Sequence, residues 1–288
     1  MPAASAGFDA RRFKAMERAG YNRIAARYAA GADTLRAKLN QALLTAAQLA
    51  PGQRVLDLAS GPGVLAGGAA QQVGSSGLVL ASDLAEAMLA EARRSLSNLS
   101  PQAGQLRYVA TDAEQLCLAD RCFDRVLAGL ALFAVPHPAR AVAEIHRVLA
   151  PGGLLALSVW ADRASVPLIH CAQDCIARLL PPPKVPRPSV FRLGEAAVLT
   201  DLLQSAGFSA IDLQPCDFNC HFADAAAYWQ AFLDLAGGAA EALSRLPTSI
   251  QQRLQDEVSH ELSDYRCEDE RGGYLLPARC LIAVARRR

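Results

Sequence analysis

The sequence predicts an α/β fold in which a mainly parallel sheet is covered by helices on both faces. Short apolar runs alternate with helical patterns between residues 50 and 160, and this alternation produces right-handed strand–helix–strand units. The run at 123–133 is almost continuously apolar, which is typical of a strand buried on both faces. With 288 residues, 52% of them hydrophobic, the chain can form one large domain or a domain with a substantial insertion.

The elements of the first half follow from hydrophobic periodicity and from glycine and proline breaks. Two helices are expected before the first strand, at 9–30 and 33–49, and the stretch APGQ ends the second of them. Strands are then expected at 54–59, 77–83, 106–112, 123–133 and 154–160. The helices expected between them lie at 64–73, 85–96 and 138–150.

After Trp160 the alternation gives way to a different pattern. A helix is expected at 170–180, followed by a proline-rich surface segment at 178–194. Later elements are expected as a helix at 195–208, a strand at 209–218, a helix at 224–235, further helices to about 266 and a final strand at 274–287. These last helices separate the two final expected strands.

The charge balance argues against several classes of partner. The chain has 29 Lys and Arg against 28 Asp and Glu, a net charge of +1, whereas proteins that grip a phosphate backbone usually show a clear basic excess. No nucleic-acid partner is therefore expected. No apolar run approaches the length of a membrane span, and the first twenty residues do not resemble a secretory signal. We expect a cytoplasmic protein with no membrane partner.

The eight cysteines include one arrangement that could suggest a zinc site. His170, Cys171 and Cys175 are mirrored by Cys216, Cys220 and His221. The second group lies on or beside an expected strand, where four residues span roughly 13 Å, too far for two ligands of one ion. We therefore expect no metal, and reduced, partly buried thiols.

The stretch VLDLASGPGVLAGGAA at 55–70 holds a glycine loop that fits two kinds of nucleotide site. As Gly61-x-Gly63-x-x-Ala66 it matches the dinucleotide fingerprint of a nicotinamide oxidoreductase. As Asp57-x-Ala59-x-Gly61-x-Gly63 it places a carboxylate beside the loop. A carboxylate there repels a phosphate and suits an ammonium or sulfonium cation.

Two further acids supply the rest of an adenosyl site. Asp83 ends the second strand and can accept the ribose hydroxyls, and Asp112 ends the third and can accept the adenine amine. Leu84 and Met88 lie one helical turn apart and can pack on the adenine face. All these residues follow carboxyl ends of parallel strands, where open α/β sheets bind ligands.

These motifs resemble the class I S-adenosylmethionine-dependent methyltransferases, and in particular the small-molecule group of the ubiquinone and menaquinone pathways. The resemblance covers about 50–160 and rests on VLDLASGPG, ASDLAEAMLAEAR, YVATDAEQL, FDRVLAGLALF and EIHRVLAPGG. It implies a Rossmann-like seven-stranded sheet of order 3-2-1-4-5-7-6 with an antiparallel last strand. Residues 209–218 would be the sixth strand and 274–287 the seventh.

The resemblance also implies S-adenosyl-L-methionine as cofactor. It brings Gly61 and Gly63 to the methionine part, and Asp112 with Ala113 to the adenine. Gly129 would line the cofactor, and Tyr28 would close over its carboxylate, although helix packing explains a single Tyr equally well. The expected cofactor-binding residues are Tyr28, Asp57, Ala59, Gly61, Gly63, Asp83, Leu84, Met88, Asp112, Ala113 and Gly129.

Substrate choice is expected to come from parts outside the core. We divide the chain into N-terminal helices that form part of a cap (1–49), a cofactor-binding core (50–218), a helical substrate cap (219–270) and a final core strand (271–288). Aromatic residues could line an apolar cavity under the cap, or could simply pack it on the core: Tyr21, Phe133, Trp160, Tyr228, Trp229 and Phe232. A small, largely apolar or aromatic methyl acceptor is therefore expected.

The reaction itself is less determined by the sequence. His137, on the loop after the fourth strand, is a candidate base or substrate ligand, or else a solvated loop residue. The acceptor atom (O, N, C or S) and the oligomeric state, a homodimer included, stay open. Two alternatives also remain: a methyltransferase-fold protein that binds the cofactor without catalysis, and the nicotinamide oxidoreductase.

Overall fold

The computed structural model describes residues 8–183, 185–235, 240, 242–243 and 245–288, except for the side chains of 32–35. Its core is a seven-stranded sheet of order β3-β2-β1-β4-β5-β7-β6, as predicted. Strands β1 to β5 run parallel, and β7 runs antiparallel to both β5 and β6. The strands are β1 (Arg54–Leu58), β2 (Leu78–Asp83), β3 (Gln105–Ala110), β4 (Phe123–Gly129), β5 (Leu149–Trp160), β6 (Phe208–Phe222) and β7 (Tyr274–Arg287).

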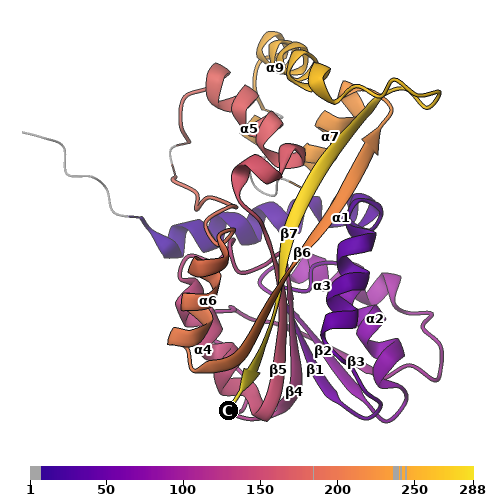
Figure 1. Ribbon diagram of the computed structural model, residues 1–288, viewed down its shortest axis with the longest axis vertical. Coiled ribbons are helices and arrows are strands. Elements are labelled where there is room, and N and C mark those ends of the chain that lie inside the picture. Colours follow the sequence, from indigo (N-terminus) through magenta and orange to yellow (C-terminus); the bar gives the residue numbers. More distant parts are fainter. Residues whose placement is uncertain (1–7, 184, 236–239, 241, 244) are drawn as a thin grey trace, which may run out of the picture.

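Helices cover both faces of the sheet. Helices α2 (Val64–Val73) and α3 (Glu86–Ser95) lie on one side, and α4 (Pro138–Val148) and α6 (Ala196–Ser205) lie on the other (Figure 1). The chain moves across the sheet in one direction from β1 to β3 and in the opposite direction from β4 to β5. Because each crossover is right-handed, the helices of the two halves lie on opposite faces. Each helix buries one apolar stripe; in α4 its buried residues are Ala141, Val142, Ile145 and Val148.

The two helices expected before the sheet are one helix, α1 (Ala10–Ala46). The prediction of a break near residue 31 was wrong, because no proline interrupts the pattern and a helix tolerates a single Gly31. Asp9 caps the helix by accepting a hydrogen bond from the Arg12 amide (2.9 Å). Figure 1 shows the first half of α1 crossing the molecule between the sheet and the cap helices, while its last part runs beside α2.

The cap contains more of the chain than the sequence indicated. Helices α7 (Ala225–Leu235) and α9 (Thr248–Glu261) lie between β6 and β7, and α5 (Pro167–Leu179) packs against both although it precedes β6. Arg178 of α5 pairs with Glu257 (2.7 Å) and Glu261 (2.6 Å) of α9. Two short 3₁₀ turns, η1 (Arg163–Ser165) and η2 (Leu262–Tyr265), complete this part. Figure 1 shows the long β6 and β7 rising out of the sheet towards these helices.

The strand predicted at 209–218 runs on to Phe222, because buried and exposed residues continue to alternate from Cys216 to its end. Conversely, the apolar run at 123–133 is a strand only to Gly129 and then turns. In the part of the chain that the structure describes, no helix combines the length and apolarity that crossing a membrane requires.

Small residues allow α2 to pack closely on its neighbours. A Cβ atom on Gly67 would lie 2.6 Å from Leu96 beyond α3, and one on Gly68 would lie 2.5 Å from Leu44 of α1. Gly63, the N-cap of α2, has a left-handed φ of +85°, and its Cβ would lie 2.8 Å from that of Ala92. The run of glycines and alanines therefore sets the distance between helices as well as the shape of the loop.

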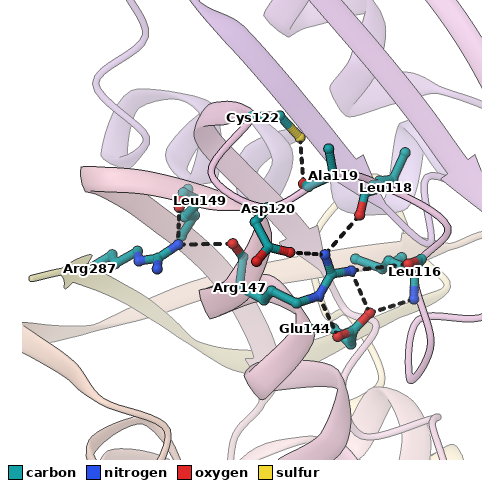
Figure 2. A network of polar contacts seen from close by, with 9 residues as sticks. All are labelled: Leu116, Leu118, Ala119, Asp120, Cys122, Glu144, Arg147, Leu149 and Arg287. Carbon is teal, nitrogen blue, oxygen red and sulfur yellow. Dashed lines mark hydrogen bonds and ion pairs between the residues drawn. The ribbon is translucent and has the colours of Figure 1, made fainter.

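A polar network fixes the loop that follows β3 (Figure 2). Arg147 of α4 donates to the carbonyl of Leu116 (3.0 Å) and to the carboxylate of Asp120 (2.6 Å). Glu144, one turn earlier, accepts from Arg147 and from the Leu116 amide (2.7 Å). The network thereby ties the β3–β4 loop, which begins near Asp112, to the helix that precedes β5.

We expect Gly63→Ala to lower the free energy of unfolding by more than Gly152→Ala does. Both glycines have positive φ, so each substitution costs about 1 kcal/mol of backbone strain. Only Gly63 adds a clash with Ala92, which costs roughly 1–3 kcal/mol more, because nothing lies within 4 Å of a Cβ on Gly152. Urea unfolding of both variants measures the difference, and equal losses would contradict the packing role of Gly63.

Candidate functional site

Two adjoining cavities open at the carboxyl ends of the parallel strands. The first, which we call the loop-side cavity, has a volume of about 150 Å³ and is bounded by α1 and the ends of β1 to β4. The second, the cap-side cavity, has about 460 Å³ and lies between α1, the ends of β4 and β5, helices α5 and α7, and the segment 187–190. Both are lined by the same six residues of α1 and the β4–α4 loop: Phe13, Glu17, Tyr21, Tyr28, Leu130 and Ala134.

The loop-side cavity collects most of the residues expected to bind the cofactor. They come from the ends of four strands, from the first turns after them and from α1. Those that line it are Tyr28, Ala59, Gly61, Asp83, Leu84, Met88, Asp112, Ala113 and Gly129.

Asp83 connects the glycine loop to the end of β2. One carboxylate oxygen accepts a hydrogen bond from the Gly61 amide (2.9 Å), and the other accepts from the Ala85 amide (2.8 Å). Burial raises the pKa of Asp83, and these amides oppose the rise. Gly61 and Ala59 are both in the left-handed region, with φ near +54° and +53°. The carboxylate is thus held in one orientation at the wall of the cavity.

Two of the expected residues do not line the cavity. Gly63 faces α3, so its absent side chain serves helix packing. Asp57 is completely buried in β1, and neither of its carboxyl oxygens has a hydrogen-bond partner. Burial raises its pKa to about 8, and the amide of Ala66, in the first turn of α2, lowers it. Asp57 is therefore not exposed to a ligand in the cavity.

Asp112 is engaged by a lysine that the sequence analysis did not single out. Lys14 of α1 contacts the Asp112 carboxylate (2.7 Å) and the carboxylate of Glu114 (2.8 Å). These bonds raise the pKa of Lys14 although its burial opposes them. The second oxygen of Asp112 accepts from the Glu114 amide (2.9 Å). This cluster fastens the N-terminal part of α1 to the loop after β3.

Tyr28 stands between the two cavities. Its hydroxyl accepts a hydrogen bond from Arg36 (2.9 Å), whose guanidinium also lies 5.3 Å from the centre of the ring. Tyr21 meets the ring of Tyr28 edge-on at 5.9 Å. A Cβ on Gly61 would lie 3.8 Å from the Tyr28 ring, so the tyrosine covers the glycine loop.

The cap-side cavity has the aromatic walls that the sequence predicted. The predicted residues that line it are Tyr21, Phe133, Trp160, Tyr228 and Phe232. Trp229 does not line it; its ring stacks on Phe232 from behind, with centroids 5.7 Å apart. The Tyr228 hydroxyl donates to the Leu168 carbonyl (3.1 Å) and accepts from the Ala172 amide (3.0 Å) of α5, so its ring and not its hydroxyl serves the cavity.

The cap-side cavity also contains charged groups that the sequence pattern did not indicate. Glu17 of α1 pairs with Arg187 of the proline-rich segment (Oε1 to Nη2, 2.7 Å), and Arg36 is a third charged residue of the lining. The helical spacing of Glu17, Tyr21 and Tyr28 places them on one face of α1, which the sequence alone could have indicated. Arg187 had no such signal, because it lies outside any regular element.

His137 does not belong to either cavity. It is the N-cap residue of α4, and its amide donates to the Glu114 carboxylate (2.8 Å). The imidazole is absent from both linings, so the structure does not support its predicted role as base or substrate ligand. The sequence placed it on the correct loop, but the direction of a loop side chain is decided by packing.

The cysteine groups also follow secondary structure. Cys171 and Cys175 lie on α5, whereas Cys216 and Cys220 lie within β6, which runs through both positions. Burial raises the pKa of Cys220 to about 11. Among the residues that the structure describes, no group of three or more His, Cys, Asp or Glu side chains is arranged to hold a metal ion.

Comparison with known sequences gives matches over the core. Residues 56–157 match the family described as "Methyltransferase domain". The ubiquinone/menaquinone biosynthesis C-methyltransferase UbiE of Bordetella avium (strain 197N) is 37% identical over 153 residues, which are 51% of this chain and 58% of that protein. The protein of the same name from Klebsiella pneumoniae (strain 342) is 30% identical over 174 residues, 56% of this chain and 68% of that protein.

Comparison with solved structures gives the same fold. Phosphoethanolamine N-methyltransferase 2 of Haemonchus contortus, in complex with S-adenosyl-L-methionine, superposes with a TM-score of 0.54 and 18% identity. The match covers 87% of this chain and 52% of that chain. The chain spans only about half of the length of several curated relatives that it matches. Its cap lies outside the matched family domain.

We expect the stability of the protein to fall as the pH rises from about 4 to about 8, in part because of Asp57. Its pKa is about 8 in the fold and about 3.8 when the chain is unfolded, so between these values the folded state binds the extra proton. The asparagine of Asp57→Asn cannot ionise. For each pH unit in this range, the free energy of unfolding of the variant should therefore fall by up to about 1.4 kcal/mol less than that of the native protein. Urea unfolding from pH 5 to pH 8 measures it; parallel profiles for the variant and the native protein would refute the assignment.

Proposed function

This chain belongs to the class I S-adenosylmethionine-dependent methyltransferases, the family of the ubiquinone/menaquinone biosynthesis C-methyltransferases, and on this premise we propose that it methylates a small, largely apolar or aromatic acceptor. One observation carries the proposal. A cavity with the expected groups for an adenosyl ligand adjoins an aromatic cavity, and one face of α1 lines both. A donor and an acceptor bound side by side need this arrangement.

S-adenosylmethionine is the cofactor of this family, and the residues that line the loop-side cavity suit its adenosyl part. When bound, it supplies a methyl group activated by a sulfonium charge. We assign Asp83 to the ribose hydroxyls, because its carboxylate is already oriented by two amides and lines the cavity. Asp112 and Ala113 are assigned to the adenine, with Leu84 and Met88 packing on its face. Lys14 occupies one Asp112 oxygen, and a carboxylate has lone pairs enough to accept a further donor.

Family membership decides against the nicotinamide oxidoreductase, and the structure supplies a physical reason. A pyrophosphate would need the amides at the N-terminus of α2. Gly63, the N-cap of that helix, is instead packed against Ala92 of α3.

The cap-side cavity supports the acceptor class that we propose. Its walls are mainly aromatic and aliphatic side chains from α1, α5, α7 and the ends of β4 and β5. Such walls bind planar or apolar molecules and exclude water, which supports in-line methyl transfer. A cofactor-binding protein without catalysis would not need a second cavity of about 460 Å³ that opens on the first, so we favour the enzyme.

We expect Asp83→Ala to weaken the binding of S-adenosylhomocysteine by roughly 100-fold, because two charge-assisted hydrogen bonds to the ribose would be lost. Isothermal titration calorimetry measures the change. Asp124→Ala is the matched control: Asp124 also accepts a backbone amide, that of Arg54 (2.8 Å), but at the opposite ends of the strands. The control should bind within about twofold of the native protein. Normal binding by Asp83→Ala would show that the ribose assignment is wrong.

A further inference from the structure

Gln173 of α5 brings a polar group with a defined direction to the cap-side cavity. Among the described residues of that lining it is the only one with a side-chain amide. Arg163 donates a hydrogen bond to its Oε1 (3.1 Å), and a guanidinium can only donate. The oxygen end of the amide therefore belongs to Arg163. The NH2 end is left for a bound molecule, because no described residue accepts a hydrogen bond from it.

Ser189, in the proline-rich segment, has the same polarity. Its Oγ accepts a hydrogen bond from the Phe191 amide (3.2 Å), so the proton of the hydroxyl remains to be donated. Arg163 stands at this side too, since its guanidinium lies 5.7 Å from the centre of the Phe191 ring. Gln173 and Ser189 thus come from two segments that share one arginine, and both line the cap-side cavity.

The oxygen atoms of other polar side chains in this lining are engaged as well. The Tyr28 hydroxyl accepts from Arg36 (2.9 Å), which leaves its proton to be donated. Glu17, the one carboxylic acid among the described lining residues, is paired with Arg187 (2.7 Å). These oxygens face groups that can only donate, so the cavity mainly offers N–H and O–H donors to a ligand. A ligand atom that accepts hydrogen bonds is favoured there, whereas a donor would leave donors unpaired on both sides.

We propose that the methyl acceptor carries a ketone or ester carbonyl, whose oxygen accepts hydrogen bonds from the Gln173 amide and the Ser189 hydroxyl. This inference rests on the proposed function and adds the chemical class of the acceptor. The apolar walls hold the body of the molecule, and the carbonyl fixes its orientation relative to the loop-side cavity. A molecule with an N–H group in place of the carbonyl is rejected, because it meets two donors.

Indanone and indole test this polarity, because they are bicyclic molecules of similar size with opposite hydrogen-bonding groups. The carbonyl of indanone can only accept, and the N–H of indole can only donate. Isothermal titration calorimetry measures the affinity of each probe for the protein saturated with S-adenosylhomocysteine. We expect indanone to bind at least about tenfold more tightly than indole, the effect of hydrogen bonds that one probe makes and the other cannot. Equal affinities, or tighter binding of indole, would overturn the inference.

Gln173→Glu changes the polarity of the site at one group. It keeps the length of the side chain and an oxygen for Arg163, and it replaces the NH2 donor by a carboxylate oxygen. The ratio of indanone to indole affinity should fall by at least about tenfold. Gln204→Glu adds the same charge at an exposed position of α6, outside the lining, and should keep the native ratio. An unchanged ratio in Gln173→Glu, or an equal fall in Gln204→Glu, would contradict the assignment.

Binding of S-adenosylhomocysteine separates this inference from the proposed function. A Gln173→Glu variant that binds it is folded. If that variant does not bind it, Ser189→Ala at an exposed position replaces it, and the ratio should then fall by about threefold. An unchanged ratio in Ser189→Ala, or failure of the loaded native protein to bind indanone, would overturn the inference alone. Failure of the native protein to bind S-adenosylhomocysteine would instead overturn the proposed function.

Discussion

The Asp83 carboxylate makes two hydrogen bonds on which the site depends. By accepting the amides of Gly61 and Ala85, it joins the loop after β1 to the end of β2 and fixes both against the same cavity. The glycine loop can take this path only because Ala59 and Gly61 adopt left-handed conformations and Gly63 lets α2 approach α3. The carboxylate, the loop and the helix packing are therefore one arrangement, and a change in any of them moves the others.

Helix α1 performs the corresponding task for the second cavity. It is fastened to the core through Lys14, which bridges Asp112 and Glu114, and it presents Glu17, Tyr21 and Tyr28 to both cavities. The loop that receives Lys14 is in turn held by the Arg147 network of α4 (Figure 2). The linings of the two cavities thus converge on one helix that crosses the carboxyl ends of the strands.

The family resemblance predicted the sheet order, and the positions of the acids predicted most of the residues that line the loop-side cavity. Asp83 ends β2 and Asp112 follows β3, and the ends of parallel strands meet at one edge. The same reasoning predicted aromatic residues in the lining of the cap-side cavity, because Trp160 ends β5 and Phe133 follows β4. It failed where a side chain's direction matters: Gly63 faces α3, Trp229 stacks behind Phe232, and His137 lies outside both cavities.

The sequence by itself determined the family, the sheet and most of the lining of the loop-side cavity, since these depend on local patterns of apolar residues, glycines and acids along a short stretch. Only the tertiary structure decided what surrounds the acceptor. Glu17 and Arg187 are 170 positions apart and come together because α1 crosses beneath the cap, where the proline-rich segment meets it. An ion pair between distant segments depends on how elements pack, and no local periodicity records it.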